Sequence, residues 1–192
     1  MSSFQSASSN TSSRSNLIRA TGHEFVLAFV NGSSPAELLE NYFTKSGPSI
    51  TEHGSVSARV RLPYLGKTFR GRKVSEGAPS DESTCDDYFD LLGATLAFHS
   101  LDKALPPPEA YIVDAESKHI PGRLVAGHTR AAEPQGSGAL LVKAHVKIEA
   151  LKSKVVWEED FVFLLSEFDQ DGKIGHLEIW SDNLSAWLAV GE

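Results

Sequence analysis

The sequence predicts an α+β protein in which helices come first and a run of antiparallel strands follows. Two helix starts carry a capping residue: Ser34 precedes Pro35, and Thr84 precedes a segment with apolar residues at helical spacing. The second half of the chain instead alternates apolar and polar residues with a period of two, most clearly over 139–150. This order favours three N-terminal helices packed on one face of a bent antiparallel sheet.

The N-terminal segment differs from the rest of the chain in composition. Residues 1–16 are mostly Ser, Asn and Gln, and such a segment buries too little apolar surface to offset the entropy lost on ordering. We therefore expect a disordered tail over 1–16 and a single domain over 17–192. Within that domain, the apolar run Glu24–Val30 predicts a first short helix that Asn31 and Gly32 end.

The second and third helices are predicted from their caps. Ser34 and Glu37 have the spacing of a capping box, with Pro35 at the first helical position. After Thr84, apolar residues recur at helical spacing: Cys85, Tyr88, Phe89, Leu92 and Leu96.

Seven strands are expected from the remaining patterns. They cover Ser49–His53, Leu96–Ser100, Ala110–Ala115, Leu124–Arg130, Ala139–Ala150, Val155–Phe168 and Lys173–Asp182. In the fifth of these, Val142, Ala144, Val146 and Ile148 share one face, which is either the core face or, in the reversed register, an interface.

Composition and charge exclude several classes of protein. The net charge is −7 and the pI is near 5.5, so the molecule as a whole repels nucleic acid and anionic membrane. No apolar run approaches the roughly 20 residues of a membrane helix, and no apolar stretch marks a secretory signal. The single cysteine, Cys85, cannot form an internal disulfide, which fits a reducing compartment. We expect a cytoplasmic protein with no nucleic-acid or membrane partner.

One electropositive stretch departs from this acidic balance. It contains Arg59, Arg61, Lys67, Arg70, Arg72 and Lys73. No aromatic interleaving or nucleic-acid motif accompanies it. We expect a solvated loop that the acidic stretch Asp81–Asp87 neutralises.

Residues Glu167–Glu178 fit the spacing of a calcium-binding loop, with acids at positions one, three, five and twelve. However, position one is Glu rather than Asp, and β-forming residues flank the segment. A hairpin turn at Asp169–Gly172 explains the same residues. No histidine pair has metal-ligand spacing, so we expect neither a metal nor a cofactor.

Two segments carry a resemblance to a known family. Residues 168–174 (FDQDGKI), followed by 178–182 (EIWSD), resemble the close of SnoaL-like proteins, and 62–71 resembles the link before their third helix. The chain is therefore similar to the nuclear-transport-factor-2-like superfamily, in its SnoaL-like (polyketide cyclase/dehydratase-type) branch, over about residues 24–187. Residues 185–190 resemble a feature of uncharacterised fungal members.

The resemblance implies a cystatin-like cone or half-barrel of curved sheet, closed by three helices around a hydrophobic pocket for a small apolar metabolite. Because members of the family include dimerising modules, we also expect a homodimer. The loops 71–81 and 121–138 are longer than a minimal member needs. Two functions stay open: a cofactor-free lyase, cyclase or isomerase that works by acid–base chemistry, or a non-catalytic ligand-binding or dimerisation module.

The resemblance also points to candidate catalytic residues. Asp182 matches an acid that points into the cone in enzymatic members, and burial among aromatic rings would raise its pKa. In the alternative, Asp182 caps the turn at Asn183 and faces water. Glu178 is a second candidate acid, and the alternative for it is a charged residue on the outer face of the sheet. His53 is a candidate histidine partner for Asp182 in proton transfer. The expected pocket-lining residues are Tyr42, Tyr64, Phe69, Tyr88, Phe89, His99, Trp157 and Trp180.

Overall fold

The computed structural model describes residues 4–73, 83–99, 105–118 and 136–191, with side chains from residue 12 onwards. Its helices are α1 (Phe4–Val30), α2 (Pro35–Tyr42), α3 (Cys85–Thr95) and α4 (Asn183–Val190), with short 3-10 turns η1 (Val56–Val60) and η2 (Pro108–Ala110). Its strands are β1 (Ser49–Glu52), β2 (Lys67–Arg70), β3 (Leu96–His99), β4 (Ile112–Asp114), β5 (Ala139–Ala150), β6 (Val156–Ser166) and β7 (His176–Trp180). The predicted α+β class is confirmed.

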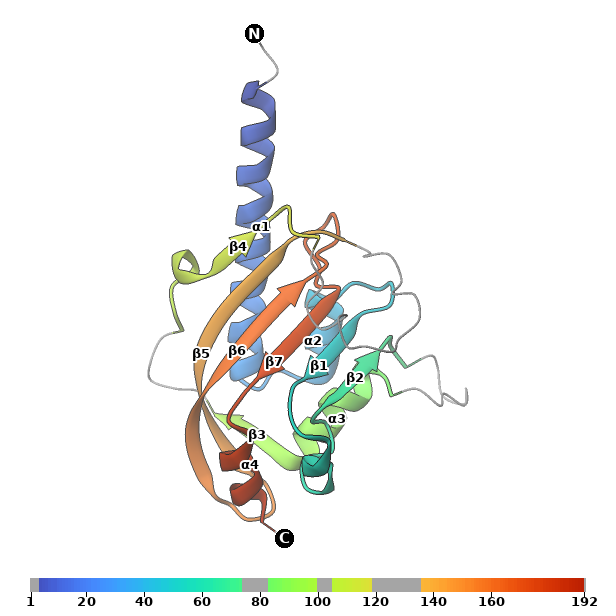
Figure 1. Ribbon diagram of the computed structural model, residues 1–192, viewed down its shortest axis with the longest axis vertical. Helices are drawn as coiled ribbons and strands as arrows, with labels where there is room; N and C mark the ends of the chain where they lie inside the picture. Colours follow the sequence, from blue (N-terminus) through green and yellow to red (C-terminus); the bar gives the residue numbers. More distant parts are fainter. Residues whose placement is uncertain (1–3, 74–82, 100–104, 119–135, 192) are drawn as a thin grey trace.

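The strands form one curved sheet with helices α1, α2 and α3 behind it (Figure 1). The strand order is β2-β1-β7-β6-β5-β3, and β4 pairs with the same edge of β5 as β3 does. One expectation is corrected, because β1 runs parallel to β7 and the sheet is therefore mixed rather than antiparallel. The long connection between these two strands, which contains the rest of the sheet, makes a parallel pairing possible.

The two predicted capping boxes are confirmed. The Ser34 side chain accepts from the backbone N–H of Glu37, whose carboxylate accepts from the Ser34 N–H in return. Thr84 and Asp87 make the same reciprocal pair at the start of α3.

The first helix is longer than expected. Where the sequence suggested a disordered tail over 1–16 and a short helix after it, the backbone is helical from Phe4 to Val30. The described side chains of this segment show what holds it in place. Arg14 Nη2 donates to the carbonyl of Phe168 at 2.8 Å and to that of Ser137 at 3.2 Å, and Ile18 is fully buried.

The sheet has an inner face, which packs against the helices, and an outer face on the opposite side. On β5, the alternating residues Val142, Ala144, Val146 and Ile148 are all buried on the inner face. On β6, Phe163 lies on that face and packs against Phe29 of α1, with ring centroids 5.4 Å apart. The core reading of the β5 pattern is thus confirmed. The strand expected at Leu124–Arg130 lies outside the described residues.

The fourth helix was not expected from the sequence. Strand β7 ends at Trp180, and Asp182 is the N-cap of α4. The helix lies at one end of the sheet (Figure 1). There the Ser153 hydroxyl donates to the Ala189 carbonyl, and the Arg61 guanidinium lies 4.3 Å above the Trp187 ring. None of the described helices is long and apolar enough to cross a membrane.

Candidate functional site

Two glutamates occupy the otherwise apolar inner face of the sheet. Strand β1 alternates so that Ile50 and Glu52 point inward, and β6 places Glu159 in the same series as Phe161 and Phe163. Only 3% of Glu52 and 7% of Glu159 is exposed. Because a carboxyl group is rarely buried without a partner, this inner carboxyl pair is the first candidate for a functional site.

Glu52 is held by a tyrosine from the third helix. The Tyr88 hydroxyl donates to Glu52 Oε2 at 2.7 Å. Tyr64 packs edge-on against Tyr88, with ring centroids 6.3 Å apart. Burial and the charges of Glu52 and Glu159 raise the pKa of Tyr64 well above its ordinary value, so its hydroxyl lies within electrostatic reach of both carboxyls.

Glu159 has a partner on only one of its two oxygens. The Trp157 indole N–H donates to Glu159 Oε2 at 2.9 Å. The other oxygen, Oε1, is buried and has no hydrogen-bond partner among the residues that the structure describes. A buried acceptor without a donor costs free energy, about 1–3 kcal/mol, which a ligand or water molecule at this point would recover.

Burial raises the pKa of both inner carboxyls towards neutrality. The pKa of Glu52 rises to about 8 because of burial, against the lowering effect of the Tyr88 hydrogen bond, and the charge of Glu159 adds to the rise. The pKa of Glu159 rises to about 7, again through burial, with the Trp157 bond opposing and the charge of Asp182 adding. Near pH 7 the pair therefore offers a protonated carboxyl beside one that is about half ionised, which is the combination that acid–base chemistry uses.

Asp182 lies at the start of α4 and is exposed. Its carboxylate accepts from the Ser185 hydroxyl at 2.5 Å and from the Leu184 N–H at 3.1 Å. The Ser185 hydrogen bond is the main reason that the pKa of Asp182 is lowered. The expectation of a buried acid with a raised pKa is thus corrected, because the chain leaves β7 two residues earlier and the carboxylate serves as a helix cap.

Glu178 and His53, the other two predicted catalytic residues, do meet, but on the outer face. His53 Nε2 and Glu178 Oε2 are 2.6 Å apart, and the His53 ring stacks on Trp180 at 4.2 Å between centroids. Behind them, His176 Nε2 lies 3.5 Å from Glu178 Oε1, and Ser49 Oγ lies 2.6 Å from His176 Nδ1. We call these five side chains the outer histidine cluster.

The outer histidine cluster holds its carboxylate in the ionised form. Burial alone would raise the pKa of Glu178, yet the hydrogen bonds with His176 and His53 bring it below its ordinary value. Glu178 is only 1% exposed. Its neighbours Leu177 and Ile179 take the inner face, so the even-numbered side chains of β7 do not point towards the helices.

The predicted pocket-lining residues divide between several places. Tyr88 and Trp157 donate hydrogen bonds to the inner carboxyl pair, and Tyr64 and Phe69 both pack against Tyr88, with ring centroids 6.3 and 5.4 Å away. The remaining aromatic residues of the prediction lie elsewhere: Phe89 against Phe29, Tyr42 against Phe25, and Trp180 in the outer histidine cluster.

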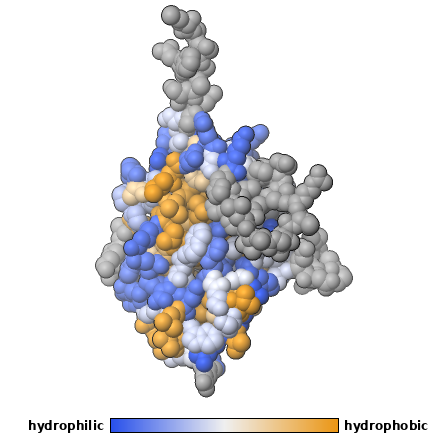
Figure 2. All heavy atoms as spheres, in the orientation of Figure 1, coloured by the Kyte–Doolittle hydropathy of each residue, from blue (hydrophilic) through white to orange (hydrophobic). Residues whose placement is uncertain are grey.

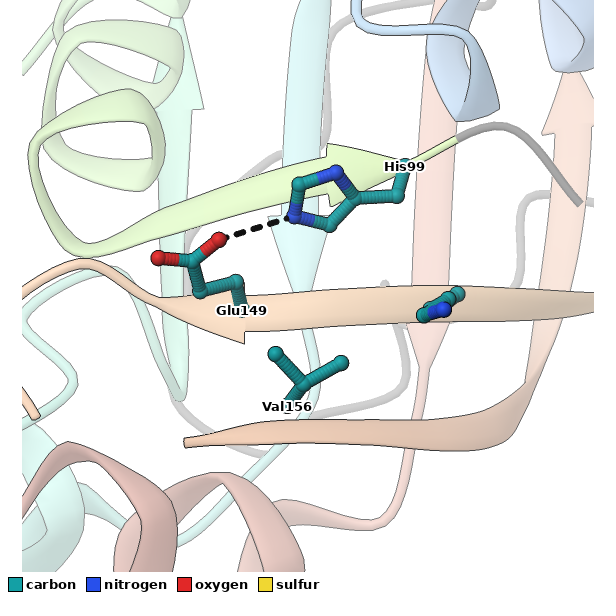
Figure 3. A pocket seen from close by; sticks show the side chains of 4 residues that line it. His99, Glu149 and Val156 are labelled. Atoms are coloured by element: carbon teal, nitrogen blue, oxygen red, sulfur yellow. Dashed lines mark hydrogen bonds and ion pairs between the residues drawn. The ribbon is translucent and has the colours of Figure 1, made fainter. Parts of the chain in front are cut away.

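His99 lies on the edge strand β3 and faces outward. It lines an open hollow of about 570 Å³ together with Lys147, Glu149 and Val156. Figure 3 shows its ring directed at Glu149, with Nε2 and Oε2 3.1 Å apart. His99 therefore lies on the outer surface and does not line the inner pocket, which corrects the prediction.

The segment with calcium-loop spacing forms a hairpin turn. The Asp169 carboxylate accepts from the backbone N–H groups of Asp171 and Lys173, and Gly172 has a φ of 79°. The Arg14 guanidinium donates a hydrogen bond to the Phe168 carbonyl, so this backbone oxygen of the loop already has a partner. Among the described residues, no group of three His, Cys, Asp or Glu side chains is placed to hold a metal ion.

The basic stretch is held largely by internal contacts. Arg72 pairs with Asp86 at 3.1 Å, and Lys73 pairs with Asp87 and Asp90. Arg59 donates to the backbone carbonyls of residues 65 and 66. The expected neutralisation by the acidic segment is seen for the part of that segment that the structure describes.

Sequence reasoning named Glu52 only as the neighbour of His53 and did not single out Glu159. A signal for both was present. Each is an acid at an apolar position of a two-residue period, beside Ile50 in one strand and beside Phe161 and Phe163 in the other. An acid on the core face of a strand is a marker of a buried titratable group.

The chain matches no protein-family model and no curated protein. Among solved structures it is similar to a nuclear-transport-factor-2-like protein from Burkholderia xenovorans, at 13% identity over 92% of this chain and 98% of that chain, with a TM-score of 0.49. It is also similar to a SnoaL-like protein from Jannaschia sp. (10% identity, 89% and 92% covered, TM-score 0.44). A third is a phenazine biosynthesis-related protein from Pseudomonas aeruginosa (13% identity, 90% and 86% covered, TM-score 0.43).

Two of these neighbours bear the names of the superfamily that the sequence resembles, and the observed order of helices and curved sheet is the one that this resemblance implies. With TM-scores below 0.5, the likeness carries no conclusion about activity, ligand or assembly. What the inner carboxyl pair does follows from its own contacts.

Proposed function

We propose that this chain is a small-molecule-binding domain whose inner carboxyl pair carries out cofactor-free acid–base chemistry, of the kind that isomerases, lyases and cyclases use. The observation that supports it most is the buried Oε1 of Glu159, which has no hydrogen-bond partner among the described residues, together with a second buried carboxyl on the same face, Glu52, on which Glu159 acts electrostatically. Both pKa values lie close to neutral pH, where proton transfer in either direction is efficient.

The contacts divide the roles within the pair. Glu159 is the base, since its free Oε1 can take a proton from a carbon next to a carbonyl group. Glu52 is the acid: its Oε2 already accepts from Tyr88, so the proton of the neutral form is carried by Oε1 and can be donated to the carbonyl oxygen. The C–H electrons then form the carbon–carbon double bond of an enol, and the carbonyl oxygen takes the Glu52 proton. Where the ketone carries a β,γ double bond, the dienol returns its O–H proton to Glu52 while Glu159 gives its proton to the γ-carbon, which completes an isomerisation.

The test is the exchange of carbon-bound hydrogen in deuterated water. A panel of small cyclic ketones with uncharged, cationic and anionic substituents is incubated with the protein, and loss of the α-proton signal is followed by NMR. We expect exchange above the buffer rate for at least one member, and Glu159→Gln to reduce it by about 100-fold or more.

Glu158→Gln is the matched control. Glu158 is the next residue along the same strand, but it is exposed on the outer face and lies 3.1 Å from His145. Its variant should exchange at the wild-type rate. Exchange that is absent for the whole panel, or that survives Glu159→Gln, would contradict the proposal.

A dimerisation module is the second candidate, and an apolar outer patch favours it. Ile112 of β4 and Leu141 of β5 are paired in register and are 68% and 37% exposed. The half-buried Val162 and Leu164 of β6 continue this patch on the same face. Figure 2 shows a hydrophobic area over these strands. Such a patch on the outer face of a sheet is typical of a protein interface.

The homodimer is tested by light scattering after size-exclusion chromatography. Leu141→Lys should convert a dimer to a monomer, whereas Val60→Lys should not, because Val60 is 87% exposed on the distant turn η1. A monomeric wild-type protein at high concentration would remove this candidate and leave the inner site unaffected.

A further inference from the structure

We propose that the ligand of the inner carboxyl pair is a small amine, bound as its ammonium cation on an apolar body. This inference rests on the proposed function for the location of the site, but not for the reaction. It names a ligand class that the aromatic and acidic groups at this end of the sheet are suited to bind.

Acidic groups are concentrated at the site. Glu159 raises the pKa of Glu52, and Asp182 at the start of α4 in turn raises that of Glu159. Each ionised carboxyl therefore makes ionisation of the next one less favourable. A cation placed among them would offset this repulsion, because it attracts each ionised carboxyl.

The nearby basic side chains are engaged elsewhere. Lys67 of β2 donates to the Ser83 hydroxyl, Arg59 donates to backbone carbonyls, and Arg61 stacks on Trp187. None of them is among the causes of the pKa shifts of Glu52 and Glu159. In the part of the chain that the structure describes, the groups acting on these two carboxyls are Tyr88 of α3, Trp157 of β6 and Asp182.

An independent observation points to a donor group on the ligand. Glu159 is 7% exposed, and its buried Oε1 lacks any partner within the described part of the chain. An ammonium group carries three N–H donors and no acceptor, so it can satisfy this oxygen and keep two further donors for other acceptors. A hydroxyl or a carbonyl ligand supplies one donor or none.

The aromatic side chains supply the rest of a cation site. Trp157 donates to Glu159, Tyr88 donates to Glu52, and Tyr64 lies within electrostatic reach of both carboxyls. The faces of such rings attract a cation, by about 2 kcal/mol when it is desolvated. They also pack against an apolar body, which completes the expected ligand.

Binding of a cation should release protons. Near pH 7 Glu52 is protonated and Glu159 is about half protonated, and a bound ammonium group would favour the ionised form of each. Affinity should therefore rise with pH between about 6 and 8 and level off above that, as long as the amine itself stays protonated.

Titration calorimetry with three matched probes tests the inference on the full chain. Benzylammonium, benzyl alcohol and benzoate have the same ring and differ in the polar group, which is a cation, an uncharged hydroxyl and an anion. We expect benzylammonium to bind about tenfold or more tightly than benzyl alcohol, and benzoate not to bind. Repeating the titration in two buffers of different ionisation enthalpy should show release of about one proton per amine bound.

Two variants test whether amine binding depends on the charge of Glu159 rather than on a change in the fold. Glu159→Gln should weaken benzylammonium by about tenfold and leave benzyl alcohol unchanged, whereas Glu158→Gln on the outer face should change neither. The proton release in the wild-type protein decides the matter even if Glu159→Gln does not fold.

Each outcome bears on a different claim. If benzyl alcohol binds as tightly as benzylammonium, or if amine binding releases no proton, the ammonium inference is overturned, while the proposed acid–base site stands. If none of the probes binds, the inference is also overturned, and the ketone exchange experiment decides separately whether the proposed function fails with it.

Discussion

On the outer face of the sheet Glu178 lies between two imidazole rings, whereas on the inner face Glu52 has only the hydroxyl of Tyr88. Both side chains are almost fully buried, at 1% and 3% exposed. Yet the pKa of Glu178 is lowered, and that of Glu52 rises to about 8. The difference shows that burial alone does not determine the charge of a carboxyl in this sheet: two imidazole partners offset it at Glu178, whereas one tyrosine hydroxyl does not at Glu52.

The two sites also serve different ends. Glu178 and His53 join the neighbouring strands β7 and β1 on the outer face, so their hydrogen bond contributes to the stability of the sheet. Glu159 Oε1 and Glu178 Oε1 both lack a hydrogen bond within the described residues, but Glu178 also has the His176 imidazole at 3.5 Å, whereas the described partner of Glu159 is the Trp157 indole alone. A buried group that costs stability and titrates near neutral pH is typical of a functional site rather than a structural one.

The largest expected effect is a loss of stability when the outer histidine cluster loses its carboxylate. Glu178→Gln removes the charge that accepts from His53 and His176, and should lower the free energy of unfolding at pH 7 by about 2–3 kcal/mol, because hydrogen bonds to a buried charged group are lost. Urea unfolding measures this. Glu158→Gln, exposed on the same face, should change it by less than about 0.5 kcal/mol. A similarly small effect of Glu178→Gln would mean that Glu178 is not ionised.

The protonation of Glu52 on the inner face is tested by comparing how the stability of Glu52→Gln and of the wild type depends on pH. Folded Glu52 keeps its proton up to about pH 8, whereas in the unfolded chain it ionises near its ordinary value of 4.5. Between these values the unfolded state binds fewer protons, so wild-type stability falls as pH rises, by at most about 1.4 kcal/mol per pH unit. Glu52→Gln should abolish this part of the slope.

Glu52→Gln should therefore match the wild type near pH 5 and exceed it in stability by about 2 kcal/mol at pH 8. Glu178 has the opposite sign: its contribution is present above its unfolded pKa and is lost as the pH falls through the lower folded pKa. Unfolding curves recorded from pH 4 to pH 9 test both. Parallel curves for Glu52→Gln and the wild type would show that Glu52 is ionised in the folded state.

The smallest effect concerns Asp182, which follows β7 in the sequence and is exposed. Asp182→Asn keeps a good N-cap for α4 and should change stability by less than about 0.5 kcal/mol, whereas Asp182→Ala should cost about 1 kcal/mol. Asp182→Asn should also lower the pKa of Glu159, because it removes a neighbouring negative charge. A loss of ketone exchange by about 100-fold in Asp182→Asn would instead restore Asp182 as a catalytic residue.

Local signals in the sequence predicted much of the fold. The caps at Ser34 and Thr84 and the alternation of β5 depend on neighbouring residues only, and each was confirmed. Helix α4 was missed because its sequence, NLSAWLAV, has no polar face to mark a helical period. The parallel pairing of β1 with β7 depends on contacts between segments far apart in the chain, which no local pattern records.

For a related reason, the sequence could not show which side of β7 faces the helices. A period of two separates Glu178 from Leu177 and Ile179 but does not say which set faces the helices. Here all of His176–Ile179 is buried, so neither face is marked by exposure. Glu178 and His53 were therefore predicted separately as catalytic candidates, with the outer face as the alternative for Glu178, and their pairing on that face was not predicted. Glu159 was passed over among its apolar neighbours.

The most direct test is a titration of the glutamate side-chain carboxyls by NMR, with ¹³C label at Cδ and assignment by the Gln variants. The account predicts that Glu52 and Glu159 titrate near pH 8 and pH 7, while Glu178 titrates below 4.5. If Glu52 and Glu159 both titrate near 4.5 like exposed glutamates, the inner carboxyl pair is not the acid–base site that we propose.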